Sequence, residues 1–144
     1  MFTLDKRLEK ESLLIKELES IQIRLMDVDE IFWILLIPKK PHLIELSDLN
    51  VNERNHLMNL AVDFGNYIKS YDNYDKVNIG MLGNIVSQLH IHVVLRKIDD
   101  AAWPDPVWGR EFTNLDKKTK EYRSKLINKF SFKTNSIQST LNHN

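Results

Sequence analysis

Two histidines and a glutamine alternate with apolar residues in the stretch from 86 to 96, which reads Val-Ser-Gln-Leu-His-Ile-His-Val-Val-Leu-Arg. A period of two is typical of a half-buried β-strand, on which successive side chains point to opposite faces. Gln88, His90 and His92 would then form one polar row, with neighbours roughly 6.5–7 Å apart along the strand. Two imidazoles and an amide at that spacing can hold a small anionic group together.

Three interpretations of this row are open on the residues alone. The row can be a solvated strand face without chemistry. It can supply two zinc ligands, although the chain has no cysteine and His42, His56 and His143 are not placed near the row by sequence. It can also carry phosphoryl or nucleotidyl transfer, with one imidazole as nucleophile and its neighbour as a hydrogen-bonding acid.

Composition restricts the class of protein and of partner. The 144 residues suit one domain, and Lys plus Arg equals Asp plus Glu at 20 each, so no overall field attracts nucleic acid or an anionic membrane. The absence of cysteine suits a reducing cytosol. The longest apolar run, residues 31–37, is far shorter than a membrane span, and the N-terminus has no signal-peptide pattern. We therefore expect a cytoplasmic protein that binds anions locally.

Hydrophobic periodicity predicts the elements that position the row. Three segments with apolar residues at helical spacing are predicted helices, at 5–20, 51–70 and 115–130. Three β-rich runs are predicted strands before the row, a hairpin at 21–26 and 31–37 and a short strand at 76–80. This order predicts a single α+β domain with a mainly antiparallel sheet. The domain spans residues 1–132, with its core at about 20–110 and a C-terminal tail and helix at 111–132, and the polar residues 133–144 are expected to be disordered.

Residues 88–94, Gln-Leu-His-Ile-His-Val-Val, resemble the histidine-triad (HIT) motif, His-φ-His-φ-His-φ-φ with φ apolar, except that Gln88 stands for the first His. Upstream, residues 78–84 resemble the segment that precedes the triad, and residues 37–40 resemble the end of the family's second strand. Downstream, residues 102–109 with their two tryptophans resemble the tail of a bacterial subgroup, similar to diadenosine tetraphosphate hydrolases, that carries Gln at the first triad position.

The resemblance implies a five-stranded sheet flanked by helices, a homodimer and a nucleotide hydrolase or nucleotidyl transferase. Such an enzyme acts at the α-phosphate of a nucleotide or of a dinucleoside polyphosphate such as diadenosine tetraphosphate, through a nucleotidyl-histidine intermediate. His90 matches the nucleophile, and His92 matches the residue that hydrogen-bonds the phosphate or leaving group. Gln88 would keep the row ordered, but an amide cannot take up a proton at neutral pH.

The resemblance also implies four nucleotide-binding positions. Asp27 matches an acidic residue that holds the ribose hydroxyls, although it also fits an ordinary turn. Asn78, Gly83 and Asn84 match positions that touch phosphate or orient the site, and the glycines of this turn also suit a plain hairpin. We expect no built-in metal or other cofactor, and Mg²⁺ would enter only with a polyphosphate substrate.

Trp33 is a second departure from the family, which usually has a histidine near the start of its second strand. We expect Trp33 and Gln88 to be a matched pair, in which an indole and an amide fill the space of two imidazoles. Both departures favour a rival function, a nucleotide-binding or adaptor protein with little or no catalysis. The intact pair of His90 and His92 favours the enzyme.

Overall fold

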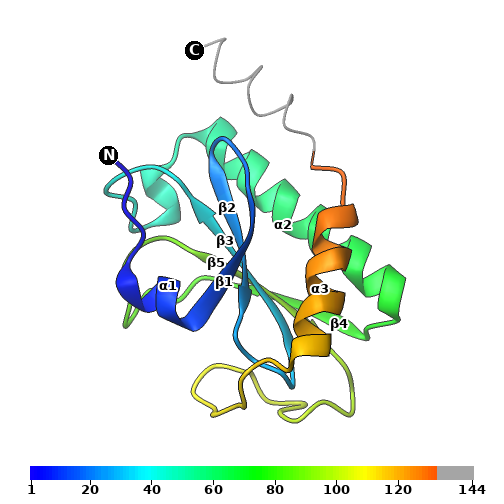
Figure 1. The fold of residues 1–144 in the computed structure, drawn as a ribbon. Helices are drawn as coiled ribbons and strands as arrows, with labels where there is room; N and C mark the ends of the chain where they lie inside the picture. The colour runs from blue at the N-terminus through cyan, green and yellow to red at the C-terminus, as the bar shows by residue number, and fades with distance from the viewer. Residues whose placement is uncertain (133–144) are drawn as a thin grey trace.

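The computed structural model describes residues 1–132, which fold around one five-stranded antiparallel sheet in the order β1-β2-β3-β5-β4 (Figure 1). The strands are β1 (Ser12–Glu17), β2 (Ile21–Met26), β3 (Phe32–Pro38), β4 (Lys76–Gly80) and β5 (Ile91–Arg96). The helices are α1 (Lys6–Glu11), α2 (Val51–Asp72) and α3 (Lys117–Lys129), with a 3-10 turn, η1, at Leu46–Asp48. The expected α+β class and five-stranded antiparallel sheet are therefore confirmed.

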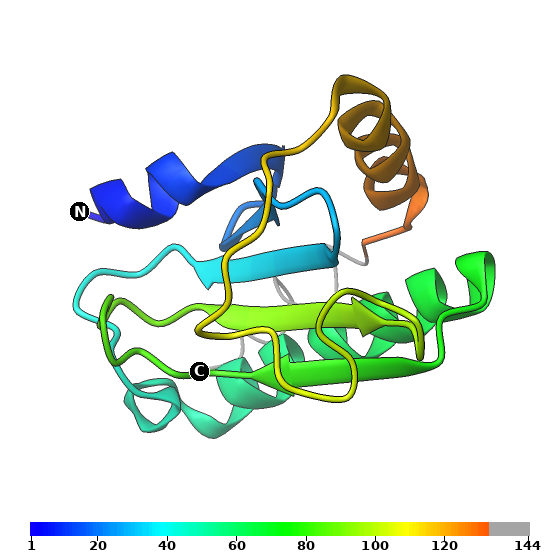
Figure 2. The ribbon, with the colours of Figure 1, turned by 90° about the horizontal axis from the view of Figure 1, so that it is seen from below.

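Helices α2 and α3 cover one face of this sheet, and α1 and the segment after β5 cover the other. The yellow segment of Figure 2 crosses the sheet face as an irregular loop before it reaches α3. The apolar stripe of α2 packs against the alternate residues Ile91 and Val93 of β5. On the opposite face, Leu8 of α1 and Val107 of the loop pack around Trp33. The sheet therefore lies between two apolar layers, and every residue of β3 is buried.

The first helix is shorter than predicted, because residues 12–17 form an edge strand instead of continuing α1. Ser12–Glu17 pairs antiparallel with β2, which places Ser12 opposite Met26. The buried guanidinium of Arg24 on β2 donates to the Ser12 carbonyl and hydroxyl oxygens at 3.0 and 2.7 Å. The prediction of a helix over residues 5–20 was therefore wrong beyond Glu11, since pairing with β2 outweighs the local helical spacing.

The strand that carries the two histidines begins later than the alternating pattern predicts. Residues 86–90 are irregular, and β5 begins at Ile91. β4 ends at Gly80, which is paired with His92, and the last pair between β3 and β5 joins Leu36 to Ile91 although β3 continues to Pro38. Before Ile91, the backbone N–H of Leu89 donates to the Leu43 carbonyl instead. The hairpin of β2 and β3, the long helix α2, the strand β4 and the final helix α3 are confirmed. The expected disorder of residues 133–144 lies outside the described residues.

No helix within residues 1–132 is long and apolar enough to cross a membrane.

A buried ion pair fixes the turn that follows β5. Arg96 is 1% exposed and donates to both carboxylate oxygens of Asp100 at 2.7 and 3.1 Å. The third guanidinium nitrogen, Nη1, donates to the side-chain oxygen of Asn78 on β4 at 3.0 Å. The guanidinium also lies over the Trp103 ring. Burial alone would raise the pKa of Asp100, but the hydrogen bonds from Arg96 and from backbone N–H groups, including that of Ala102, hold this pKa below its ordinary value.

We expect Asp100→Ala to lower the free energy of unfolding by about 3–5 kcal/mol, because the buried Arg96 would lose its counter-charge. Asp105→Ala is the matched control, since its ion pair with Arg110 is exposed and should contribute little. Urea denaturation followed by circular dichroism measures both. The depressed pKa of Asp100 means that its contribution is present at neutral pH and is lost as the pH falls through that pKa. Equal losses in the two variants would contradict this account.

Candidate functional site

His90 and His92 lie on the sheet face opposite α2, at the start of β5. Their neighbours Leu89, Ile91 and Val93 belong to the apolar core beneath α2. Both histidines are buried, 7% and 6% exposed, and their ring centroids are 4.8 Å apart. The alternating pattern thus places the two imidazoles side by side, as expected.

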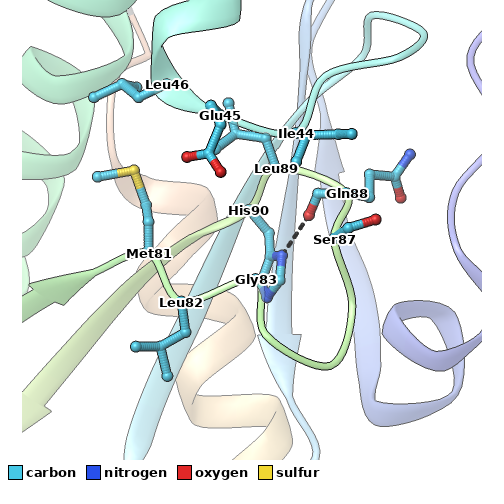
Figure 3. A pocket seen from close by; sticks show the side chains of 10 residues that line it. All are labelled: Ile44, Glu45, Leu46, Met81, Leu82, Gly83, Ser87, Gln88, Leu89 and His90. Atoms are coloured by element: carbon cyan, nitrogen blue, oxygen red, sulfur yellow. Dashed lines mark hydrogen bonds between the residues drawn. The ribbon is translucent and has the colours of Figure 1, made fainter.

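The imidazole of His90 is held by a backbone carbonyl. Its Nδ1 lies 2.6 Å from the Gln88 carbonyl oxygen, the contact drawn as a dashed line in Figure 3. A carbonyl oxygen only accepts hydrogen bonds, so Nδ1 must carry the proton. In the neutral ring this leaves the lone pair on Nε2, which is the atom that can act as a nucleophile.

The imidazole of His92 is held in the opposite tautomer by Trp33. The indole Nε1–H of Trp33 donates to Nδ1 of His92 at 2.9 Å. An indole N–H can only donate, so the single proton of the neutral His92 ring lies on Nε2. Burial, together with a smaller effect of the neighbouring His90, lowers the pKa of His92 to about 3. The site therefore offers an N–H donor from His92 and, from the neutral form of His90, a lone pair on Nε2.

The Gln88 side chain leaves the histidine row and binds the N-terminal segment. Its Oε1 accepts from the backbone N–H of Asp5 at 2.8 Å, and its Nε2 donates to the Thr3 carbonyl at 2.9 Å. Figure 3 shows the amide directed away from the His90 ring. Gln88 therefore acts on His90 through its backbone carbonyl, and Gln88 and Trp33 bind different partners instead of each other.

A cavity of about 540 Å³ lies in front of the two histidines. Gly83, Asn84 and Arg110 also line it. The size suits a ligand as large as a nucleotide, and most of the other lining residues form an apolar wall. That wall includes Leu8, Met26, Trp33, Leu35, Trp108 and Phe112.

A smaller cavity of about 210 Å³ also borders His90, on the side of η1 (Figure 3). Ser87, Glu45 and Gly83 contribute to its lining. The loop residue Gly83 has a φ of +71°, a left-handed conformation that glycine adopts without strain, and it lines both cavities. His90 is thus accessible to a ligand from two sides.

Trp108 lines the larger cavity and packs on Gly80, a contact that the sequence pattern did not reveal. A Cβ atom at position 80 would lie 2.9 Å from the Trp108 ring, so the bare backbone of Gly80 makes room for the indole. The Trp108 ring meets His92 and Trp33 edge-on, at centroid distances of 5.4 and 6.2 Å. In the sequence, only the concentration of glycine and tryptophan residues around the histidine motif pointed to this contact.

Asp27 and Asn78 line neither of these two cavities. The Asp27 carboxylate accepts from the backbone N–H of Leu115 and the side-chain amide of Asn114, both at 2.9 Å. It therefore attaches the segment before α3 to the end of β2. Asn78 instead accepts from Arg96. Within residues 1–132, no three His, Cys, Asp or Glu side chains gather where they could hold a metal ion.

We expect the Nε2–H tautomer of His92 to persist in the folded protein from neutral pH down to about pH 3. Trp33→Phe should raise the pKa of His92, because Nδ1 is then free to take up a proton. Trp103→Phe is the matched control, since the Trp103 ring packs on Arg96. Titration of the imidazole signals by NMR measures the pKa values.

The same shift has a consequence for stability. Between about pH 6.5 and 3 the unfolded chain binds a proton at His92 that the folded protein does not, so the free energy of unfolding should fall as the pH drops through this range. A His92 signal that titrates near pH 6.5 would contradict the assigned tautomer.

Comparison with known proteins gives one family match and several similar structures. The HIT domain family matches residues 7–98, and no curated protein matches the chain. A histidine triad protein from Bradyrhizobium japonicum is 30% identical with a TM-score of 0.84, covering 88% of this chain and 96% of that one. A histidine triad (HIT) protein from Sinorhizobium meliloti is 34% identical with a TM-score of 0.83, covering 88% and 95%.

A hypothetical histidine triad nucleotide-binding protein from Sulfolobus tokodaii shares the fold, at 19% identity and a TM-score of 0.58, with 93% of this chain and 89% of that one covered. The family match covers more than half of the chain, from α1 to the end of β5, and includes both histidines of the site. The chain therefore belongs to the HIT domain family.

Proposed function

We propose that this chain is a nucleotide hydrolase or nucleotidyl transferase that acts at the α-phosphate of a nucleotide or dinucleoside polyphosphate through a nucleotidyl-histidine intermediate. The observation that carries the proposal is the pair of complementary tautomers that line a nucleotide-sized cavity. His90 offers an Nε2 lone pair and His92 an Nε2–H donor, because their Nδ1 atoms are engaged by a carbonyl and by Trp33, respectively.

In the proposed reaction, Nε2 of His90 attacks the α-phosphorus and the His90 ring becomes positively charged. The Gln88 carbonyl, which accepts from Nδ1–H, then stabilises that charge at the moment it develops. His92 donates from Nε2 to a phosphate oxygen. Gly83 and Asn84 are the proposed phosphate contacts of the loop, since both line the cavity beside the histidines.

The apolar wall is the proposed site of the nucleoside. Trp33 and Phe112 offer aromatic surface to a base. Ribose binding by Asp27 requires its carboxylate, which accepts from Asn114 and Leu115, to reach a ligand in the cavity that it does not line. Mg²⁺ is proposed to accompany a polyphosphate substrate rather than to reside in the protein.

A nucleotide-binding or adaptor protein with little catalysis is the second candidate. It is favoured by Gln88 and Trp33, which stand where family members usually have histidine. Neither an amide nor an indole can take up an additional proton near neutral pH. The Sulfolobus tokodaii protein is named as a nucleotide-binding protein.

We also propose that the chain belongs to the subgroup similar to diadenosine tetraphosphate hydrolases. Gln88 and the tail at 102–109 support this membership.

We expect His90→Ala to abolish both the covalent adduct and turnover, while nucleotide binding persists through the loop and the apolar wall. His92→Ala should slow turnover by about 10²–10³-fold, the usual cost of one lost donor to a developing charge. His56→Ala is the matched control, because His56 lies on α2, which covers the other sheet face. Acid-quenched peptide mapping with labelled nucleotide locates the adduct. Label on His92 or a fully active His90→Ala variant would contradict the mechanism.

We also propose a cytoplasmic homodimer that has no nucleic-acid partner. Trp103 and Trp108 do not by themselves call for a partner chain, because both pack within this chain, on Arg96 and Gly80. The proposal now rests on the family resemblance and on β4, an outer strand of the sheet whose edge can pair with a second copy. Light scattering at micromolar concentration should give the mass of a dimer, and a clean monomer would remove the proposal.

A further inference from the structure

The described site holds no group that is placed to deliver a proton to a leaving group at neutral pH. His90 uses its Nε2 lone pair for the attack, and its Nδ1–H is committed to the Gln88 carbonyl. His92 is a neutral ring that can donate a hydrogen bond from Nε2 without being an acid. The Gln88 amide cannot titrate, and its side chain faces Thr3 and Asp5.

The other polar residues that line the two cavities do not fill this role. Arg110 carries a guanidinium, which does not give up its proton in proteins, and Glu11 carries a carboxylate, which accepts when ionised. In the smaller cavity, the Glu45 carboxylate already accepts from the backbone N–H of Asp48. Ser87 offers a hydroxyl there, which can donate a hydrogen bond but is a very weak acid.

Trp33 is the residue that keeps His92 from becoming the missing acid. A cationic His92 needs a proton on Nδ1, where the indole N–H of Trp33 points its own proton at 2.9 Å. The indole cannot reverse this bond, whereas a histidine at position 33 could either donate or accept. Trp33 is also held in place, because it is 6% exposed and the rings of Trp108 and Phe112 meet it edge-on. Protonating His92 would require the indole to move.

We propose that Trp33 makes this chain selective for phosphoanhydrides, whose leaving phosphate departs as a stable anion, over phosphoramidates and alkyl phosphodiesters, whose leaving group must take up a proton as it departs. The inference rests on the proposed nucleotidyl transfer at the same site and narrows its substrate class. A phosphate leaving group needs no acid because its last ionisation occurs near pH 6. An alkylamine or an alkoxide is far more basic and leaves poorly without a proton.

The proposed step balances without proton transfer to the leaving group. The Nε2 lone pair of His90 forms a bond to the α-phosphorus, and the anhydride P–O bond breaks with its electron pair on the departing phosphate oxygen. His92 stabilises the phosphate by hydrogen bonding and keeps its proton. In the second step a water oxygen bonds to phosphorus, the N–P electron pair returns to His90, and one water proton passes to solvent while the other stays on the product phosphate.

The first test compares substrates that share adenosine 5′-phosphate and differ in the leaving group. We would measure kcat/KM for diadenosine tetraphosphate, for an N-alkyl adenosine 5′-phosphoramidate, and for a 4-nitrophenyl and an alkyl ester of adenosine 5′-phosphate. The wild-type protein should cleave the anhydride and the 4-nitrophenyl ester. It should cleave the phosphoramidate and the alkyl ester about 10²–10⁴-fold more slowly than the anhydride, the range of a missing general acid.

The second test releases His92 from the indole. Trp33→Phe should reduce the ratio of anhydride to phosphoramidate cleavage by at least about tenfold, with phosphoramidate turnover rising as the pH falls and His92 becomes protonated. Trp33→His should reduce the same ratio, because an imidazole can accept a hydrogen bond from Nδ1–H of a protonated His92, whereas the indole N–H cannot. Trp103→Phe is the matched control and should leave the ratio unchanged, since Trp103 packs on Arg96. Circular dichroism establishes that each variant is folded.

The outcomes separate this inference from the proposed function. Equal cleavage of anhydride and phosphoramidate by the wild type, with label on His90, would overturn the selectivity and leave the nucleotidyl-histidine mechanism standing. An unchanged ratio in folded Trp33→Phe and Trp33→His would show that Trp33 does not set it and would also overturn the inference. No adduct and no turnover of any of the four substrates would overturn both.

Discussion

The antiparallel pairing of β3 with β5 at the centre of the sheet is the constraint on which both the core and the site depend. Its register sets Trp33 opposite Val94 and Leu35 opposite His92, so Trp33 and His92 lie diagonally on the same face. Because the other face is filled by the core beneath α2, His90 and His92 lie on the face that carries the cavity. One ladder of backbone hydrogen bonds therefore aligns the indole with the imidazole that it orients.

Hydrogen-bond direction gives the two histidines different chemical roles, although they have the same residue type and nearly the same burial. A carbonyl can only accept and an indole N–H can only donate, so the partners at Nδ1 determine which atom of each ring faces the reaction. Burial reinforces this difference, because it keeps His92 neutral. Tautomers fixed in this way before a ligand arrives need no rearrangement during the reaction, which is the sense in which the site is preorganised.

The segment before β1 and the loop between β5 and α3 complete the site. The N-terminal residues Thr3 and Asp5 hold the Gln88 side chain, and the loop that carries Trp108 forms one wall of the larger cavity. Asp27 attaches the end of this loop to β2 through the backbone of Leu115. A substitution in the N-terminal segment or in this loop can therefore affect the histidines without any change in β5.

The sequence by itself determined the alternation of β5, the apolar stripe of α2, the hairpin of β2 and β3, and the likeness to the HIT motif, because each depends on residues close together along the chain. It could not show that Ser12–Glu17 is a strand, that Gln88 turns away from the histidines, or that Trp33 binds His92. The last two contacts join residues 83 and 59 positions apart. Their partners are chosen by strand register and by the packing of distant segments, which local propensity and spacing do not encode.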